Sequence, residues 1–214
     1  MKNILVITLL LFALLLAGCE DPAANKVKAV TSESAPTADG PAFQPQGEAL
    51  AINAENSKVL FTGSKVTGKH EGGFSRFGGT IYLVDGNVEK SGVDVQIETA
   101  SVFTDADVLT EHLQTGDFFE VEKYPAASFR STRVTADKEA GPDSYKVSGN
   151  LELRGVKKFV VFPATITVTS ADVAVNADFA INRKDFGIIY AGKADDLIRD
   201  DVAIKLDLKA TRKM

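Results

Sequence analysis

Cysteine and histidine are rare in this 214-residue chain, and the three such residues are widely separated. The chain has one cysteine, Cys19, whose thiol is open to covalent modification, and two histidines, His70 and His112. Two imidazoles that approach each other could bind haem or a metal ion. The alternative, which we expect, is that each histidine makes a structural hydrogen bond or contacts the polar group of a ligand.

Two charged segments nearer the carboxyl end are further candidates for binding. Arg183, Lys184 and Asp185 could hold an anionic group, or could form a structural ion pair that fixes the turn into Phe186. The acidic residues at 195–196 and 200–201 could attract calcium, but their spacing matches no EF-hand loop. We therefore expect a solvated acidic loop there and no metal site.

Motifs of the common enzyme classes are absent from the sequence. It contains no G-x-S-x-G elbow, no H-E-x-x-H pair and no glycine-rich phosphate loop after a strand. A pair of carboxylates brought together by the fold would leave no motif, but no such pair stands out. The sequence therefore predicts a protein that binds rather than catalyses, with no catalytic residue.

The amino terminus has the parts of an export signal. Lys2 supplies a positive charge, residues 4–16 are almost entirely apolar, and Ala17 and Gly18 are small residues directly before Cys19. The apolar run is too short to span a bilayer core of about 30 Å. The ending at residues 16–19 resembles the lipobox of bacterial lipoproteins, in which a peptidase cuts before an acylated cysteine.

This resemblance implies that residues 1–18 are a signal peptide and that Cys19 carries the lipid. The protein is then anchored to a membrane of the cell envelope and faces the periplasm, with inner and outer membrane both open. The alternatives are an ordinary signal peptide with an unrelated cysteine, or an uncleaved anchor. Residues 19–54 hold four of the 7 prolines and lack an apolar period, so we expect a lipidated, disordered tether.

Residues 55–214 are enough chain for one domain, and their apolar residues alternate with polar ones. The alternation is clearest at residues 93–97, 145–153, 160–168, 173–181 and 202–208, with less regular segments at 58–66, 73–84 and 127–134. A period of two gives strands with one apolar face. About eight antiparallel strands of this kind predict an all-β domain that closes as a barrel or packs as a sandwich.

Two further features complete the expected domain. Residues 105–124 break the alternation and predict a helical insertion, with Asp107 as N-cap, Gly116 as its end, and a second turn capped by Asp117. Small residues on the apolar rows could leave a slot inside the barrel; they are Gly149, Ala164, Ala177, Ala180 and Ala203. The net charge of -5, without a basic cluster, argues against a nucleic-acid partner.

Several motifs, in order and at sensible spacing, resemble the YceI-like family. They are GKHEGGF at 68–74, EHL at 111–113, DFF at 117–119, KYP at 123–125, GNLELRGVKK at 149–158, NRKDFGI at 182–188 and DLIRDDV at 196–202. The resemblance implies a lipocalin-like antiparallel barrel with a helical insertion. It also implies a polyisoprenoid, quinone-like or other long amphipathic lipid as ligand, with no cofactor, and it leaves a homodimer open.

We therefore expect a membrane-tethered carrier of such a lipid. The candidate ligand-binding residues are His70, Phe74, Phe77, His112, Phe118, Phe119, Phe129, Phe162, Phe179, Arg183 and Phe186. For each phenylalanine, the alternative is ordinary packing of strands against the helix. Two other functions stay open: a structural or interaction module of the envelope with a filled core, and a haem- or metal-handling protein using His70 and His112.

Overall fold

The structure is a computed structural model, and it describes residues 21–33 and 46–212. Within these residues the long strands are β3 (Glu48–Asn53), β4 (Lys58–Lys65), β5 (Gly68–Phe74), β6 (Phe77–Val84), β7 (Asn87–Glu98), β9 (Ala126–Ala136), β10 (Ser144–Leu153), β11 (Val156–Val168), β12 (Asp172–Asn182) and β15 (Asp201–Thr211). The shorter ones are β1 (Val27–Lys28), β2 (Val30–Ser32), β8 (Val102–Thr104), β13 (Gly192–Lys193) and β14 (Asp196–Leu197).

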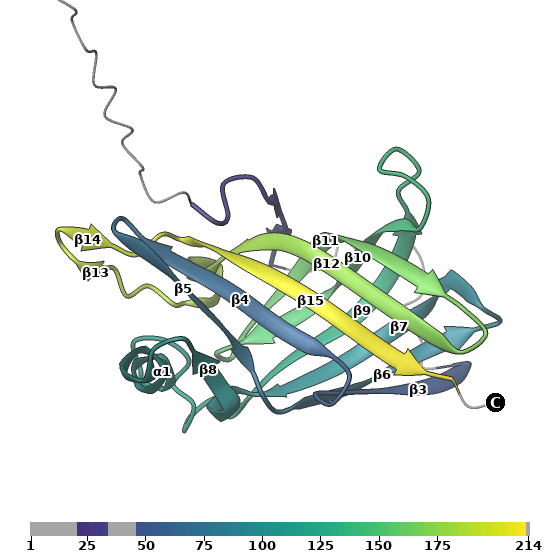
Figure 1. Ribbon diagram of the computed structural model, residues 1–214, viewed down its shortest axis with the longest axis horizontal. Coiled ribbons are helices and arrows are strands. Elements are labelled where there is room, and N and C mark those ends of the chain that lie inside the picture. Colours follow the sequence, from purple (N-terminus) through teal and green to yellow (C-terminus); the bar gives the residue numbers. More distant parts are fainter. Residues whose placement is uncertain (1–20, 34–45, 213–214) are drawn as a thin grey trace, which may run out of the picture.

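All but β13 and β14 belong to one strongly curled sheet (Figure 1). Its hydrogen-bonded order is β3-β6-β7-β9-β10-β11-β12-β15-β4-β5-β8, and the neighbours on this path are antiparallel. The edge strand β3 meets the end of β15 through side chains: Arg212 pairs with Glu48 at 2.9 Å. The all-β, lipocalin-like fold is therefore confirmed.

The alternating apolar residues explain the curl. On β12, the side chains of Val173, Val175, Phe179 and Ile181 point to the concave side, where they meet the corresponding row of β15. The β12–β15 ladder runs without a break from Asp172 opposite Thr211 to Asn182 opposite Asp201. Because each strand has one apolar face, curling brings these faces together and leaves the polar faces in water.

The main sheet has 13 strands within the described residues, more than the eight or so expected. One reason is that the segment expected at 73–84 is two strands. The chain turns at Ser75 and Arg76, so that β5 pairs with β4 while β6 pairs with β3. The other additions are β3, which lies in the stretch expected to be a tether, and the short strands β1, β2 and β8, which are too brief to show a period.

The helix α1 (Asp107–Gln114) is shorter than the sequence predicts, and it is followed by turns. Its N-cap is Ala106, which has no side chain able to cap, so the prediction of Asp107 as the N-cap is wrong. Asp107 instead lies in the first turn, where a carboxylate is favoured by the helix dipole. No helix within residues 21–33 and 46–212 is long and apolar enough to cross a membrane.

Residues 21–33, which we call the N-terminal strap, lie on the sheet and fill a gap in it (Figure 1, purple). β11 and β12 pair only from Thr165 opposite Asn176 to Val168 opposite Val173. Beyond that point the two strands separate, and the strap bonds to both. β1 runs parallel to β12 at Phe179, and β2 runs antiparallel to β11.

The stretch expected to be a tether, residues 19–54, thus differs from the prediction in the parts that the structure describes. The strap occupies its first part and β3 its last, where Leu50 and Ile52 are each only 2% exposed. Both segments gain their order from pairing with strands that are distant in sequence, which composition does not reveal. Residues 1–20, with the predicted signal peptide and Cys19, and residues 34–45 lie outside the described residues.

Two of the small residues expected inside the barrel lie on its outer face. Ala180 and Ala203 are opposite each other in the β12–β15 ladder and are buried beneath Ala23 of the strap. Their neighbours Phe179 and Ile204 line the interior, and side chains alternate along a strand. These alanines therefore form a seat for the strap, not a slot for a ligand.

Candidate ligand-binding cavity

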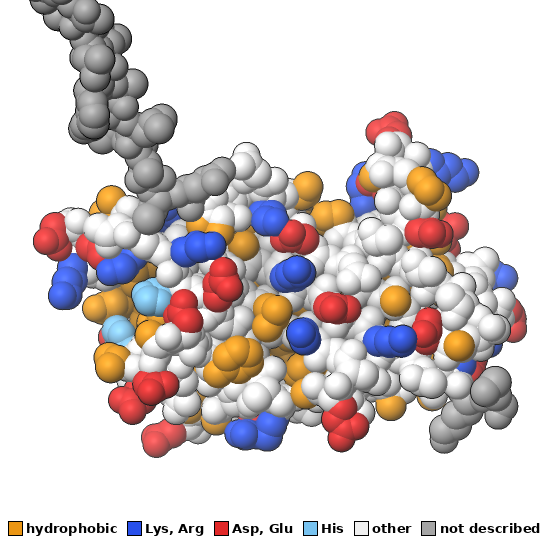
Figure 2. Space-filling model, viewed as in Figure 1, with side chains coloured by type: hydrophobic (Ala, Val, Ile, Leu, Met, Phe, Trp, Pro, Cys, Tyr) orange, Lys and Arg blue, Asp and Glu red, His pale blue; other side chains and the backbone are white. Residues whose placement is uncertain are grey.

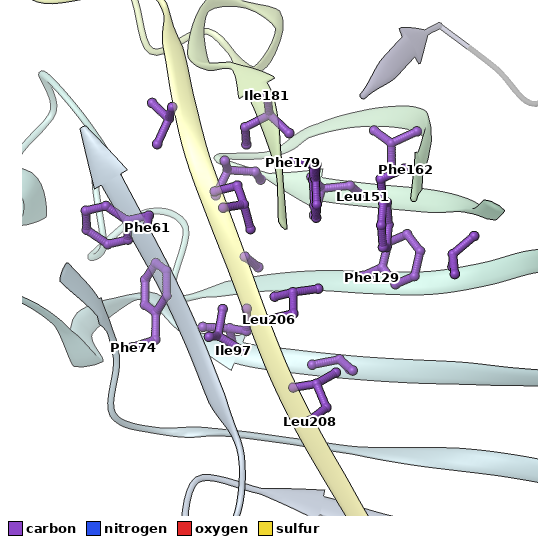
Figure 3. Close-up of a pocket in the computed structure, with 18 of the residues that line it drawn as sticks. Phe61, Phe74, Ile97, Phe129, Leu151, Phe162, Phe179, Ile181, Leu206 and Leu208 are labelled. Atoms are coloured by element: carbon purple, nitrogen blue, oxygen red, sulfur yellow. The ribbon is translucent and has the colours of Figure 1, made fainter. Parts of the chain in front are cut away.

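The apolar faces of the strands enclose a cavity of about 470 Å³. Its lining comes from β4, β5, β6, β7, β9, β10, β11, β12 and β15, together with α1 and the loops beside it. Figure 3 shows Ile97, Phe129, Leu151, Leu206 and Leu208 among the side chains that converge on this space. A volume of this size is in the range of sites that bind small molecules, about 300–1,000 Å³.

Three aromatic rings, from β9, β11 and β12, form the middle of the cavity wall. Phe162 of β11 stacks on Phe179 of β12, with ring centroids 4.4 Å apart and planes at 12°. Phe129 of β9 is tilted against Phe162, with centroids 5.5 Å apart. All three are candidate ligand contacts from the sequence, and all three line the cavity, so their rings both pack in the wall and face the empty space.

A second aromatic group lies at the end of the cavity beside α1, which we call the α1 end. Phe74 of β5 lies between Phe61 of β4 and Phe119, at centroid distances of 6.0 and 5.6 Å. Phe118 is packed with Leu113 of α1 and Ile188 in a small core of its own. These side chains place α1 across this end of the barrel.

Polar side chains also gather at the α1 end, whereas most of the lining is apolar. Lys65, His70 and Arg183 belong to the lining and stand at or near the ends of β4, β5 and β12. The side chains of His70 and Lys65 are 40% and 39% exposed. Side chains that both line the cavity and reach solvent mark an opening, so the cavity opens at its polar end.

His70 is held by a carboxylate from the loop before α1. Its Nδ1 lies 2.8 Å from Oδ1 of Asp105, and the hydrogen bond from His70 lowers the pKa of the Asp105 carboxyl below its ordinary value. When Nδ1–H donates to this carboxylate, Nε2 of a neutral imidazole is left as an acceptor. This arrangement suits a ligand group that donates a hydrogen bond, such as a hydroxyl.

Arg183 is only 4% exposed, and its guanidinium is directed to the protein itself. Nη1 donates to the carbonyl of Ile188 at 2.7 Å, and Nε donates to that of Arg199 at 3.0 Å. Nη2 lies 3.3 Å from both the Ile198 carbonyl and Asp200. Burial lowers the pKa of Arg183, while Asp200 acts in the opposite direction. These bonds support the structural reading of the charged segment, because they hold residues 188–200 against the cavity.

The remaining candidates lie beside the cavity without lining it. Phe77 packs against the main core and Phe186 is 0% exposed within it, both outside the lining. His112 packs edge-on against Phe118 and Tyr190 at 5.0 and 5.1 Å, and its Nε2 lies 2.8 Å from Oδ2 of Asp117. Phe77, His112 and Phe186 therefore occupy packing positions beside the cavity.

Other lining residues did not stand out in the sequence. Phe61 and Lys65 lie on β4, where Gly63 and Ser64 interrupt the alternation of apolar and polar residues. Leu109 and Ile198 reach the cavity from α1 and from the acidic loop, and no strand period could have indicated them. In the acidic loop, Asp196 pairs with Lys65, which lowers the pKa of its carboxyl.

The two histidines do not assemble a metal centre in the part of the chain that the structure describes. Each is paired with its own aspartate, and no group of three or more metal-ligating side chains occurs in residues 21–33 and 46–212. Both histidines are visible at the same end of the molecule, among apolar side chains (Figure 2, pale blue). The geometry that the structure describes therefore gives no support to the haem or metal reading.

Fold and site together define a lipocalin-like barrel that encloses an apolar cavity with polar, partly exposed side chains at its α1 end. Residues 50–210 match the model of the YceI-like domain, and the chain belongs to this family. A UPF0312 protein of Pseudomonas putida strain W619 is 33% identical over 146 residues, which cover 62% of this chain and 74% of the relative.

Two solved structures show the same fold. The crystal structure of BcnA from Burkholderia cenocepacia superposes with a TM-score of 0.63 at 23% identity, over 75% of this chain and 99% of the other. A polyisoprenoid binding domain from Saccharophagus degradans, implicated in plant cell wall breakdown, gives a TM-score of 0.62 at 18% identity. That alignment covers 78% of this chain and 100% of the other.

Proposed function

We propose that this protein binds and carries an isoprenoid-type or other long amphipathic lipid in the cell envelope. The observation that supports this most directly is the cavity of about 470 Å³, which is apolar along its length and has Lys65 and His70 at its open end. An apolar tail fits the interior, and a polar head group fits the opening. The polyisoprenoid-binding domain with the same fold is in line with this proposal.

The energetics of transfer explain why the opening matters for selectivity. Each CH₂ group of the tail gains about 0.8 kcal/mol when it leaves water, but a tail that comes from a bilayer is already dry. Exchange between membrane and cavity is then nearly neutral for the tail. Selectivity between lipids therefore depends on the head group, which would contact Lys65 and the His70–Asp105 pair.

We also propose that Cys19 is acylated after removal of residues 1–18, and that the barrel faces the periplasm. The lipobox-like residues 16–19 support this part of the proposal. A lipid anchor keeps the barrel beside the membrane that holds its ligand, which raises the effective concentration of one for the other. The protein then binds and presents a lipid without altering it chemically.

Native mass spectrometry of the full chain, purified from a bacterial envelope, tests the carrier function. We expect a bound species that organic extraction identifies by its isoprene mass spacing. Val175 and Ala174 are neighbours on β12, with Val175 lining the cavity and Ala174 outside the lining. The Val175→Phe variant should fill the cavity and lose the lipid, whereas Ala174→Phe should retain it.

A protein that carries no lipid and takes up no added quinone or polyprenol would contradict the proposal. An envelope interaction module would then become the working explanation, and partner proteins recovered with the full chain would support it. Loss of lipid in both phenylalanine variants would also count against the cavity as the binding site, because only Val175 lines it.

A further inference from the structure

Four large apolar side chains are exposed next to the cavity. Val66 is 58% exposed, Val108 82%, Ile189 70% and Leu197 49%. We call these four residues the apolar rim. Isolated apolar residues are common on protein surfaces, but a group around one opening indicates an interaction surface.

The position of the apolar rim follows from its neighbours in the chain. Each rim residue is directly beside a residue that lines the cavity, in the pairs Lys65–Val66, Val108–Leu109, Ile188–Ile189 and Leu197–Ile198. The backbone N–H of Val66 donates to the carbonyl of Leu197 at 3.2 Å, which joins two of these segments directly. Since one residue of each pair lines the cavity and the other is exposed, the rim surrounds the α1 end.

The start of the N-terminal strap is fixed near the same end. Asp21 lies 3.4 Å from Nη1 of Arg199, which is two residues beyond Leu197 of the rim. Ala23 is only 1% exposed, in the seat formed by Ala180 and Ala203. Cys19 precedes Asp21 by two residues, and two residues of chain span at most about 7 Å. A lipid on Cys19 would therefore enter the bilayer close to Arg199, not at the far end of a long tether.

We propose that the barrel docks on a lipid bilayer with its open end, and that the apolar rim contacts the membrane around the cavity opening. This inference rests on the acylation of Cys19 and the lipid ligand proposed above. Beyond those proposals, it states which end of the barrel faces the bilayer and by which route the lipid enters the cavity. A lipid that moves from the bilayer into an opening that rests on the bilayer never exposes its tail to water.

The charges near the opening indicate what kind of membrane contact this is. Lys65 pairs with Asp196, Lys69 with Glu71, and Arg199 with Asp21. Paired charges give no strong attraction to anionic lipids. Docking then depends on the anchor and on apolar contact, and it takes place on zwitterionic phosphatidylcholine as well as on anionic membranes.

Site-specific fluorescence in proteoliposomes tests this orientation. The acylated full chain is reconstituted into phosphatidylcholine vesicles that contain a spin-labelled phosphatidylcholine quencher. An environment-sensitive fluorophore is attached to Val108→Cys or Leu197→Cys, and, as the control, to Ser170→Cys in the exposed turn between β11 and β12. We expect strong quenching at positions 108 and 197 and none at position 170, which lies at the opposite end of β12 from Arg183.

Three outcomes would overturn the proposal. One is an unmodified Cys19 in the membrane fraction, read by mass spectrometry of the amino-terminal peptide. Another is the absence of quenching at both rim positions, which would leave the rim free for a protein partner. The third is equal quenching at all three positions, which would mean that the barrel has no preferred orientation.

A kinetic measurement separates the docking surface from the binding site. The Val108→Asp/Ile189→Asp variant places charges on two rim residues outside the lining of the cavity. Uptake of a quinone from vesicles should slow by roughly tenfold, because two apolar contacts are lost, while the amount bound at equilibrium should be unchanged.

A normal rate of uptake by this variant would contradict docking through the rim, and bound quinone would still support the carrier function. Failure of the wild-type protein to bind any quinone, with its rim labels quenched, would instead contradict the carrier function and leave the docking in place.

Discussion

Phe162 of β11 and Phe179 of β12 stack, with ring centroids 4.4 Å apart, at the place where these two strands separate. If the β11–β12 register continued beyond Thr165 and Asn176, these two residues would be directly opposite each other. The ladder instead ends there, and the backbone of Phe179 pairs with β1 of the N-terminal strap. The stacked rings thus close the inner side of a gap whose outer side the strap covers.

Truncation of this stack should destabilise the barrel. We expect Phe179→Ala to lower the free energy of unfolding by about 3 kcal/mol, at the low end for buried phenylalanines because one side of the ring already faces the cavity. Chemical denaturation of the ligand-free protein measures this change. Val108→Ala, at a position that is 82% exposed, is the control and should stay within about 0.5 kcal/mol of wild type. Equal effects for the two variants would show that the stack adds nothing to stability.

The seat of the strap offers a test of its attachment. Ala180 is 0% exposed beneath Ala23, so the larger side chain of Ala180→Leu should push the strap away, at a cost of about 1–3 kcal/mol. Limited proteolysis should then cut within residues 21–33 faster than in wild type. Ala174→Leu, on the same strand but outside this seat, should not alter that cleavage. Unchanged proteolysis in the Ala180 variant would mean that the seat does not hold the strap.

Arg183 and Lys184 are neighbours that both pair with Asp200, but only Arg183 is buried. Arg183→Met should lower the free energy of unfolding by at least about 2 kcal/mol, because three carbonyls lose their donor. Arg183→Lys should recover only part of this free energy of unfolding, since an ammonium group lacks the planar, forked set of donors of a guanidinium. Lys184→Met, which removes an exposed ion pair, should cost less than about 1 kcal/mol. Hydrogen exchange should speed up in residues 188–200 of the Arg183 variants alone.

The opening of the cavity should loosen in acid. Lys65, by hydrogen bonding to Asp196, lowers the pKa of that carboxyl below its ordinary value of about 3.9, so the contact is fully present above this pH. It is lost as the pH falls through the lowered pKa, when the carboxyl gains a proton. The Thr67 amide, which donates to Asp196 at 3.1 Å, should report the change by NMR. Asp196→Asn should abolish the pH dependence at Thr67, and its persistence would show that another group is responsible.

Many of the residues that line the cavity could be predicted from the sequence, because the side chains of a strand alternate strictly between its two faces. The alternating residues at 93–97, 173–181 and 202–208 predict apolar faces, and Val95, Phe179 and Leu206 on these faces line the cavity. Alternation is a local property, so it needs no knowledge of the neighbouring strand. The same reasoning fails for Phe61, because the irregular sequence around it has no clear period.

Contacts between segments that are distant in the chain could not be predicted from the sequence. Phe77 and Phe186 have the same chemistry as Phe129, and only packing decides that they lie outside the lining. The strap shows no apolar period, and its order comes from hydrogen bonds that two separated strands leave open. The sequence alone determined the all-β class, the alternating faces and the family. The tertiary structure decided the gap between β11 and β12, the segment that fills it, and the end at which the cavity opens, because each depends on how far-separated strands diverge or meet.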